Sequence, residues 1–454
     1  MIARSEETPT VHGNGEPVET KLLRITEKAR KEPCFKFTSL YHLMNEELLR
    51  ECFKRVRKDA AAGIDEMTKE QYAANLDANL SDLIGRLHRM AYRPQPVRRV
   101  YIPKPGSAKQ RPLGIPCLED KLVQAGLVRI LEAVYEQDFT ADSYGFRPAR
   151  SCHDALRALS DSVENKPVNH IVEADIKGFF DNVNQEWLIK FLEHRIGDKR
   201  VQRMVKRFLK AGVYEDGTIT VSDEGTPQGG VISPLLANIY LHYALDLWFE
   251  KIVRKRCTGF ARMIRYADDF VVCFQYELDA AKYRRELGGR LGKFGLEVEP
   301  TKTRVMKFGR FAVQNAKAKG ERPETFDFLG FTHYCGTRRD GKSFRMKRKT
   351  ARKKFTAKVK AFKEWLKKAR TMKTADLWET VKAKLRGHYA YYGVTDNLSG
   401  IKRYHEEVRK LLMKWLNRRG KRHCLSWEKF EGMLERFPLP EPRIKVKMFP
   451  ATVK

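Results

Sequence analysis

The chain of 454 residues carries 89 Lys and Arg against 57 Asp and Glu, which gives a formal net charge of +32. With 42% hydrophobic and 11% aromatic residues, the composition excludes an intrinsically disordered protein and predicts about three folded domains. So large a positive charge predicts a polyanionic partner, and nucleic acid is the first candidate. The alternative is that the charge serves only solubility.

No segment of the sequence has the marks of export or membrane insertion. A membrane span requires about 18 consecutive apolar residues, and the sequence has no such run. Residues 1–18 lack the apolar stretch of a secretory signal. The eight cysteines form no C-x-x-C pair, which argues against a zinc module and favours free thiols in a reducing compartment. We therefore expect a soluble protein without membrane association that is cytoplasmic in a bacterium or otherwise intracellular.

The chain begins with residues 1–36, which are polar and carry Gly and Pro among the first twenty positions, so we expect a flexible leader. Apolar residues then recur at helical spacing to about residue 90. Residues 97–103 and 111–115 are typical of strands, and the turn between them is basic. Lys104 and Arg111 are suited to hold a triphosphate across this hairpin. An exposed hairpin with ordinary surface charges is the alternative.

Residues 170–176 form a predicted strand that carries a carboxylate, Asp175, near its end. The alternative role for Asp175 is to cap the following helix, and Asp181 fits that role better. The glycine-rich turn 224–230 then precedes an apolar helix. Because this turn lacks the Lys-Ser/Thr pair of a P-loop, it is not expected to bind phosphate in that way.

Two adjacent acids, Asp268 and Asp269, lie between the predicted strands 260–264 and 270–274. Two unpaired carboxylates at a hairpin tip repel each other and resist desolvation, and a divalent cation between them relieves both effects. Mg²⁺ prefers such oxygen ligands. Asp175 supplies the third acid for a metal site of this kind. The alternative is an ordinary polar turn, since Asp is common in turns.

The composition changes near residue 345. Residues 345–422 hold 26 Lys and Arg against 6 Asp and Glu, a net charge of +20. Aromatic and aliphatic residues recur among them at helical spacing, which predicts helices that pack a core and carry the basic residues outward. Such a domain is expected to bind phosphate backbone with strong salt dependence.

Six short blocks occur in a characteristic order between residues 40 and 335. They are Arg111-Pro-Leu-Gly-Ile-Pro116, Tyr144-Gly-Phe-Arg-Pro148, Asp175-Ile-Lys-Gly-Phe-Phe180, Pro227-Gln-Gly-Gly230, Tyr266-Ala-Asp-Asp269 and Phe328-Leu-Gly330. In this order, and followed by a basic helical region, the chain resembles a group II intron-encoded reverse transcriptase/maturase of the endonuclease-lacking type. The resemblance implies an α+β fold: a right-hand polymerase with fingers and a palm of antiparallel sheet plus helices, followed by an all-α thumb/maturase domain.

The resemblance also implies the catalytic chemistry. Asp175 and Asp268 would hold two Mg²⁺ ions about 3.5–4 Å apart, with Asp269 as the supporting acid. One ion would lower the pKa of the primer 3′-hydroxyl, and the other would steady the triphosphate and the leaving pyrophosphate. The implied catalytic residues are Asp175, Asp268 and Asp269, and the implied metal ligands are Asp175, Ile176, Asp268 and Asp269.

Five residues are implied to contact the deoxynucleotide. Lys104 and Arg111 match the finger residues that clamp the triphosphate. Phe180 matches an aromatic gate that would clash with a 2′-hydroxyl, and Gln228 would line the pocket beside it. Lys302 matches a basic residue near the leaving group, although a solvated surface lysine is the alternative.

The implied organisation has five segments: a flexible leader (1–36), an N-terminal extension and fingers (37–165), a palm with the catalytic site (166–344), a basic helical thumb/maturase domain (345–440) and a short tail without an endonuclease domain (441–454). The implied function is RNA-directed DNA synthesis combined with binding of the intron RNA for splicing and retrohoming of a mobile element. The partners would be intron RNA, an RNA template, a DNA primer or target, and dNTPs. Two alternatives stay open: a domesticated reverse transcriptase in defence or DNA repair, and a splicing-only maturase.

Overall fold

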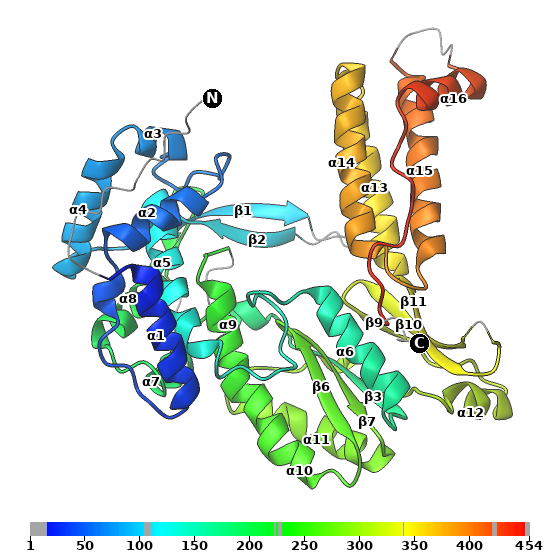
Figure 1. The fold of residues 1–454 in the computed structure, drawn as a ribbon, viewed down its shortest axis with the longest axis horizontal. Helices are drawn as coiled ribbons and strands as arrows, with labels where there is room; N and C mark the ends of the chain where they lie inside the picture. The colour runs from blue at the N-terminus through cyan, green and yellow to red at the C-terminus, as the bar shows by residue number, and fades with distance from the viewer. Residues whose placement is uncertain are drawn as a thin grey trace, which may run out of the picture.

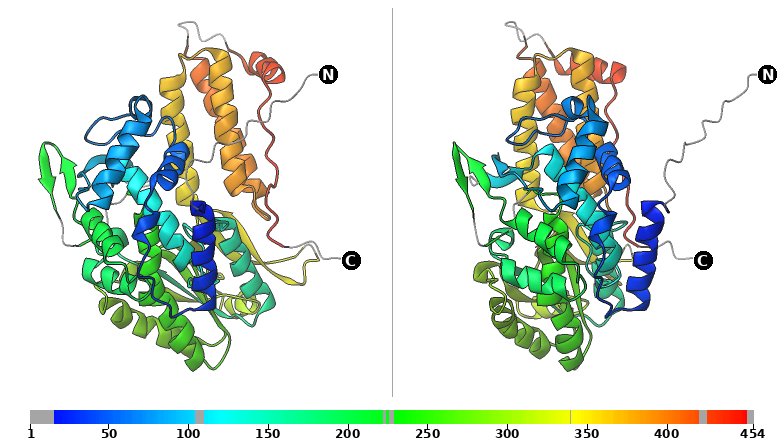
Figure 2. Two further views of the ribbon diagram at one scale, coloured as in Figure 1. Left: turned by 60° about the vertical axis from the view of Figure 1, so that its left-hand side comes forward. Right: turned by 90° about the vertical axis from the view of Figure 1, so that its left-hand side faces the viewer.

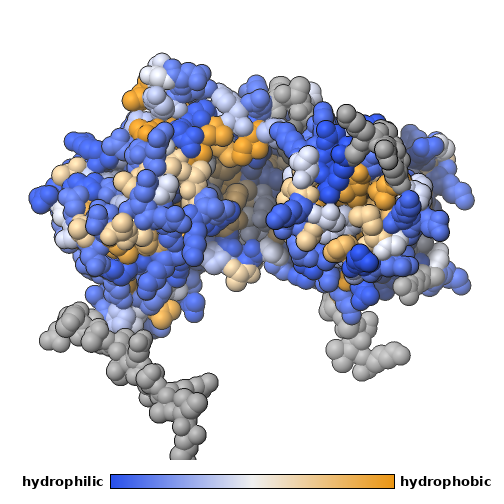
Figure 3. Space-filling view, turned by 90° about the horizontal axis from the view of Figure 1, so that it is seen from above, coloured by the Kyte–Doolittle hydropathy of each residue, from blue (hydrophilic) through white to orange (hydrophobic). Residues whose placement is uncertain are grey.

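The computed structural model describes residues 16–103, 110–221, 224–225, 229–338, 340–419 and 425–449. Figure 1 shows an N-terminal part that carries the β1–β2 hairpin, a lower part built on a four-stranded sheet, and a C-terminal group of upright helices. Seen from above, the surface is hollowed between the N-terminal part and these helices (Figure 3). The predicted α+β fold class is confirmed by this mixture of antiparallel sheets and helices.

The N-terminal part is built around helix α5, which is buried along most of its length. Helix α1 packs along α5 and buries Val18, Leu22 and Ala29, which share one helical face. Figure 2 shows α1 in dark blue on the outer side of the molecule. The flexible leader expected over residues 1–36 is therefore wrong for residues 18–31, which form a helix of the core, while residues 1–15 lie outside the described residues. The helices of this part are α1 (Val18–Lys31), η1 (Tyr41–Leu43), α2 (Glu46–Arg55), α3 (Lys69–Ala73), α4 (Leu76–His88) and α5 (Leu118–Tyr135).

The hairpin expected from the sequence is present, with Pro103 opposite Gln110 and Ile102 opposite Arg111. It points toward the upright C-terminal helices (Figure 1). Two short strands extend it into a sheet of order β2-β1-β4-β5. These strands are β1 (Val97–Pro103), β2 (Gln110–Ile115), β4 (Val213–Glu215) and β5 (Thr218–Thr220).

The central sheet corresponds to the expected palm. Its four strands are all antiparallel, in the order β6 (Ala261–Tyr266), β7 (Asp269–Phe274), β3 (His170–Asp175) and β8 (Arg304–Lys307). Along β7, Phe270, Val272 and Phe274 join one hydrophobic core, whereas Val271 and Cys273 join a second core on the other face. Because both of its faces are covered, β7 is buried and apolar from Phe270 to Phe274 instead of alternating with polar residues.

Two helices supply most of this cover. Helix α11 (Glu277–Gly292) contributes to the first core, which continues into the N-terminal part. Helix α6 (Cys152–Asn165) contributes to the second core, which continues into the C-terminal helices. The sheet therefore separates two cores, one shared with each neighbouring part of the molecule.

The remaining helices precede the C-terminal part in the chain. They are η2 (Phe179–Asp181), α7 (Gln185–Glu193), α8 (Lys199–Leu209), α9 (Ser233–Leu241), the π-helical turns η3 (His242–Asp246) and η4 (Phe249–Val253), α10 (Arg254–Arg256), η5 (Pro300–Lys302) and α12 (Ala312–Ala318). The seven cysteines among the described residues are free thiols, as expected. Over the same residues, no helix is both long enough and apolar enough to cross a lipid bilayer.

The C-terminal part begins with a second small sheet, of order β11-β10-β9. The thumb boundary expected at residue 345 falls inside β11, so this basic region starts as a strand and becomes helical only at Arg352. Its helices bury an aromatic and aliphatic core, as the sequence predicted. The elements are β9 (Phe326–Phe328), β10 (Phe331–Thr337), β11 (Phe344–Thr350), α13 (Arg352–Ala369), α14 (Thr374–Tyr392), α15 (Leu398–Leu416) and α16 (Trp427–Arg436).

The β6–β7 hairpin is anchored by Arg265, whose side chain is fully buried. Its guanidinium forms a bidentate ion pair with buried Asp246, at 2.7 and 2.5 Å. The remaining donors reach Asn238 Oδ1 at 3.1 Å, the Ala267 carbonyl at 2.9 Å and Ser143 Oγ at 2.8 Å. The Arg265 side chain thus connects α9 and η3 to the turn between β6 and β7.

Replacing Asp246 with Ala is expected to lower the free energy of unfolding by about 3–5 kcal/mol, because it leaves a buried guanidinium without its counter-ion. Urea unfolding checks this. The matched control is Glu250→Ala, which removes the partly exposed partner of Arg254 and should cost less than about 1 kcal/mol. Equal losses in the two variants would contradict the anchoring role.

Candidate active site

Three carboxylates gather at one end of the central sheet. Strands β3 and β7 run antiparallel with Asp175 opposite Asp269. Asp268 lies in the two-residue turn between β6 and β7, where Tyr266 pairs with Asp269. The strand that ends in Asp175 and the Asp268–Asp269 hairpin therefore meet, as the sequence led us to expect.

The hairpin turn is tight and closely packed. Ala267 has a φ of 57°, a left-handed conformation that is uncommon outside glycine. Gly145 packs directly against it: a Cβ atom at Gly145 would lie 2.3 Å from the Ala267 amide nitrogen. The Tyr144 N–H also donates to the Arg265 carbonyl at 2.8 Å. The Tyr144–Pro148 block thus has a physical role, since it forms the floor under the acidic turn.

Burial and mutual repulsion raise the pKa of both adjacent acids. Burial is the first cause that raises the pKa of Asp269, to about 7; the Asp268 charge raises it further, and the Leu329 N–H that donates to the carboxylate opposes the rise. Burial likewise raises the pKa of Asp268, and the Asp175 charge adds to the rise. Ionising both acids is therefore unfavourable unless a further positive charge lies close to them.

Two expected cations face these acids. Lys302, in η5, forms an ion pair with Asp175, and this hydrogen bond raises the lysine pKa. The Asp175 carbonyl is fixed by the Glu299 N–H at 2.8 Å, which holds the η5 segment beside β3. Arg111 lies on β2, and its charge lowers the pKa of Asp268. Strand β2 therefore lies close enough to the acidic turn for the charge of Arg111 to act on Asp268.

Phe180 lies just beyond Asp175, in the short helix η2, where the chain turns through Gly178. The neighbouring Phe179 is buried in the core and contacts the Phe180 ring edge-on at 5.3 Å, which leaves Phe180 half-buried at the surface. The Phe180 carbonyl lies against Gly225, 3.0 Å from where a Cβ atom would stand. A second glycine of that loop, Gly229, lies similarly against the backbone of Gly114 in β2.

Two expected nucleotide contacts are not placed by the structure. Lys104 and Gln228 lie outside the described residues. Gly225 and Gly229, which flank the second of these positions, contact η2 and β2 respectively. The glycine-rich turn thus links the hairpin that carries Arg111 to the segment that carries Phe180.

The donor set suits a hard divalent cation, although it is incomplete by itself. Among the described residues, no three His, Cys, Asp or Glu side chains form a full metal site. Asp175 and Asp268 offer carboxylate oxygens, and buried Ile176 can offer only its backbone carbonyl. Mg²⁺ keeps several waters and takes further oxygens from substrate phosphates, so a partial protein site fits it. The unneutralised charge of the acids is consistent with such an ion.

One contributor to the site was missed in the sequence. The Leu329 amide donates to the Asp269 carboxylate from the turn between β9 and β10. A backbone donor leaves no residue signature, although the Phe328–Gly330 block had drawn attention to this turn. The structure therefore adds the β9–β10 turn to the surroundings of the acids.

Comparison with known proteins agrees with this geometry. A family model described as reverse transcriptase (RNA-dependent DNA polymerase) matches residues 102–333. Over 227 residues the chain is 38% identical to the group II intron-encoded protein LtrA of Lactococcus lactis subsp. cremoris, which covers 50% of this chain and 38% of that protein. Protein YkfC of Escherichia coli (strain K12) is 36% identical over 274 residues, 54% of this chain and 71% of YkfC.

A more distant relative is the mitochondrial nuclear intron maturase 2 of Arabidopsis thaliana, 26% identical over 176 residues, or 30% of this chain and 24% of that protein. The match thus spans well under half of the length of LtrA and of the plant maturase. The matched family region contains the acidic hairpin, Asp175, Phe180 and Lys302. The chain belongs to the reverse transcriptase (RNA-dependent DNA polymerase) family and is similar to proteins encoded in group II introns.

Proposed function

We propose that this chain is an RNA-directed DNA polymerase that copies an RNA template, and that it binds its intron RNA to assist splicing and retrohoming. The polymerase proposal rests on the convergence of Asp175, Asp268 and Asp269 at one end of the palm sheet. The names of two relatives, an intron-encoded protein and an intron maturase, support the second part. A role in defence or DNA repair would use the same acids.

In the proposed reaction, the primer 3′-hydroxyl oxygen attacks the α-phosphorus of a dNTP, and the bond to pyrophosphate breaks as the new ester bond forms. Two Mg²⁺ ions held by Asp175, Asp268 and the Ile176 carbonyl would neutralise charge on the attacking and leaving oxygens. Asp269 has a supporting role. Its buried carboxylate accepts a hydrogen bond from the Leu329 amide and fixes the turn that presents Asp268. The protein's contribution is thus mainly positioning and charge.

The cations of the site would bind the triphosphate. Lys302 stays protonated because its bond to Asp175 raises its pKa, so it can offer a positive charge to the leaving pyrophosphate. Arg111 can grip phosphate oxygens bidentately from β2, and Lys104, from the same hairpin sequence, would add a point charge. The half-buried Phe180 ring would lie under the sugar and exclude a 2′-hydroxyl, with Gln228 in the same pocket.

The base of the helical thumb offers a surface for phosphate backbone. Two neighbouring cavities of about 680 and 640 Å³ share Ser399 and follow the outer side of β11. We call them together the thumb-base groove. The first is lined by Lys349, Arg352 and Arg403, none of which has a carboxylate partner among the described residues. Helices α13 and α15 both begin there without a side-chain cap, so their first N–H groups add to the attraction for anions.

Replacing Asp268 with Asn should lower primer extension on poly(rA)/oligo(dT) by about 100- to 1,000-fold, because a charge that stabilises the transferring phosphoryl group is lost. The matched control, Glu297→Gln, removes an exposed carboxylate that pairs with Lys177 at 3.0 Å and should extend as wild type does. Equal extension by wild type and Asp268→Asn would disprove the polymerase proposal.

Asp269→Asn is expected to raise the melting temperature at pH 8 in metal-free buffer, by about 2–4 °C for each kcal/mol relieved. The pKa of Asp269 is about 7 in the folded protein against an ordinary 3.8, so the folded state binds the proton more tightly than the unfolded chain. This contribution to stability is complete below pH 3.8 and is lost as the pH rises through 7. Differential scanning fluorimetry checks it: the gain should shrink at pH 5 and when Mg²⁺ is added to wild type at pH 8. A gain independent of pH would contradict the assigned cause.

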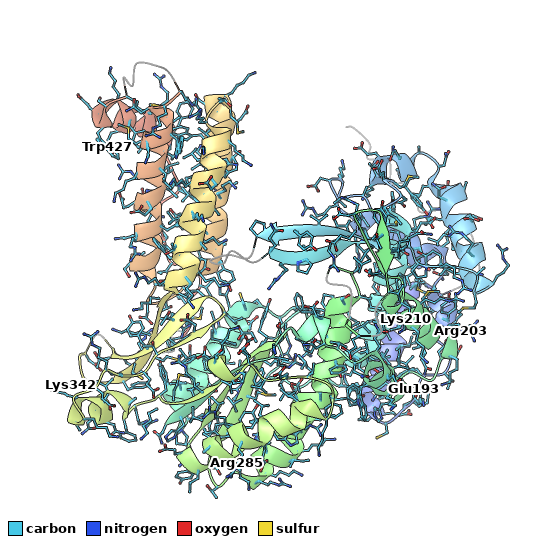
Figure 4. The ribbon with its side chains drawn as sticks, turned by 180° about the vertical axis from the view of Figure 1, so that it is seen from behind. Glu193, Arg203, Lys210, Arg285, Lys342 and Trp427 are labelled. Atoms are coloured by element: carbon cyan, nitrogen blue, oxygen red, sulfur yellow. The ribbon has the colours of Figure 1, made fainter. Side chains whose placement is uncertain are left out.

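Reversing the charges of the first cavity with Lys349→Glu, Arg352→Glu and Arg403→Glu should weaken binding of an RNA–DNA duplex and flatten its salt dependence, because each phosphate contact contributes about −0.9 to the slope of log K against log salt. The control reverses Lys282, Arg284 and Arg285, exposed residues of α11 on the far side of the palm, where Figure 4 shows Arg285. Fluorescence anisotropy at several salt concentrations measures both. The same slope in the two triple variants would exclude the thumb-base groove as a contact surface.

A further inference from the structure

The Leu329–Gly330 turn stands between the catalytic acids and the thumb. It joins β9 to β10 through two successive residues with positive φ, 49° at Leu329 and 79° at Gly330. Such a conformation at leucine is unfavourable unless neighbouring groups hold it. The position of this turn therefore depends on what is bound to its backbone groups.

Both thumb helices that start or end nearby bind this turn. The Tyr391 hydroxyl, in the last turn of α14, donates to the Leu329 carbonyl at 2.9 Å. The Ala351 N–H, at the start of α13, donates to the Gly330 carbonyl at 3.0 Å. The Tyr391 ring also stacks on Phe331, with the ring centres 6.0 Å apart and the planes at 11°.

Tyr391 is itself held against the palm. His153, near the start of α6, hydrogen-bonds the Tyr391 carbonyl through Nε2 at 2.9 Å. Burial raises the pKa of the Tyr391 phenol, so its hydroxyl remains a donor at all working pH values. The end of α14 is thus fastened to the palm helix on one side and to the β9–β10 turn on the other.

The other backbone group of Leu329 faces the acids, since its N–H donates to the Asp269 carboxylate. The N–H and C=O of one residue belong to the two peptide planes that flank a single α-carbon. When Tyr391 fixes the carbonyl, it limits the rotation that would turn the N–H away from Asp269. A single residue, Leu329, therefore connects Tyr391 of the thumb to the Asp269 carboxylate.

We propose that Tyr391 is a positioning residue that couples the seating of the thumb helix α14 to the placement of the Asp269 carboxylate, acting through the backbone of Leu329. A thumb moved by its nucleic acid would then change how the acids are set, without itself touching substrate. The inference rests on the proposed polymerase function, which gives the acids their task. It adds to that function a mechanical link between the duplex-binding part and the chemistry.

The test compares Tyr391→Phe with Tyr389→Phe. Both remove one phenolic hydroxyl from the same end of α14, but the Tyr389 hydroxyl bonds His405 Nδ1 at 2.8 Å inside the thumb. Tyr391→Phe should lower kcat by about 3- to 10-fold, the value of one hydrogen bond, with the KM for dNTP and the affinity for primer–template unchanged. Tyr389→Phe should keep the wild-type kcat. Equal kcat values, or a loss confined to KM or to thermal stability, would overturn the proposal.

A second readout does not depend on polymerisation. Hydrogen exchange of the peptide covering residues 326–331 should quicken in Tyr391→Phe only, and Mn²⁺ titration of the protein without nucleic acid should show weaker binding in that variant only. In the Asp269→Asn background, Tyr391→Phe should have little further effect on Mn²⁺ binding, since the acceptor it acts on is altered. Fully additive effects would refute the route through Asp269. If the wild-type protein extended no primer but the variants still showed these differences, the proposed polymerase function would be rejected and the coupling through Leu329 would stand.

Discussion

The buried pair of Arg265 and Asp246 is the interaction on which the active site depends. Arg265 stands three positions before Asp268, and its charge would neutralise the acidic turn if it faced that way. Instead its guanidinium points into the core, where Asp246 matches it and the remaining donors hold the turn from below. The acids are fixed in place by a cation that leaves most of their own charge uncompensated. What compensates them comes from other elements, namely Lys302 on η5 and Arg111 on the fingers hairpin.

The palm sheet divides the interior into two cores, and each core extends into a different neighbour. One face of β7 packs with residues of the N-terminal part, and the other face packs with the thumb helices. The thumb is therefore no separate body on a linker, because its core is continuous with the back of the catalytic sheet. The acids lie at one end of these strands.

Much of the site could be predicted from the sequence, for identifiable reasons. Predicted strands at 170–176, 260–264 and 270–274 marked β3, β6 and β7, and Asp175, Asp268 and Asp269 stood at or near their ends as unusually placed charges. Two features of the fold were not predicted from the sequence. The helix from Val18 to Lys31 was not predicted, because the segment is polar and its first twenty residues include Gly and Pro, although Val18, Leu22 and Ala29 share one helical face. In β11, buried Arg348 interrupts the alternation expected of a strand, so the basic run was taken for a helix start. Backbone contacts such as that of Leu329 leave no trace in composition at all.

The glycine contacts have a consequence of another kind. Gly145 meets Ala267 and Gly229 meets Gly114, in each case backbone against backbone with no room for a side chain. Such a contact limits how closely the two backbone segments can approach each other. It contains no group that titrates, and it releases no counterions. The depth of the acidic turn is therefore set by steric exclusion, which ionic strength does not alter, whereas the grip on nucleic acid varies steeply with salt. The placement of the acidic turn and the proposed hold on nucleic acid thus respond to different variables, and a change of salt can weaken that hold without moving the turn.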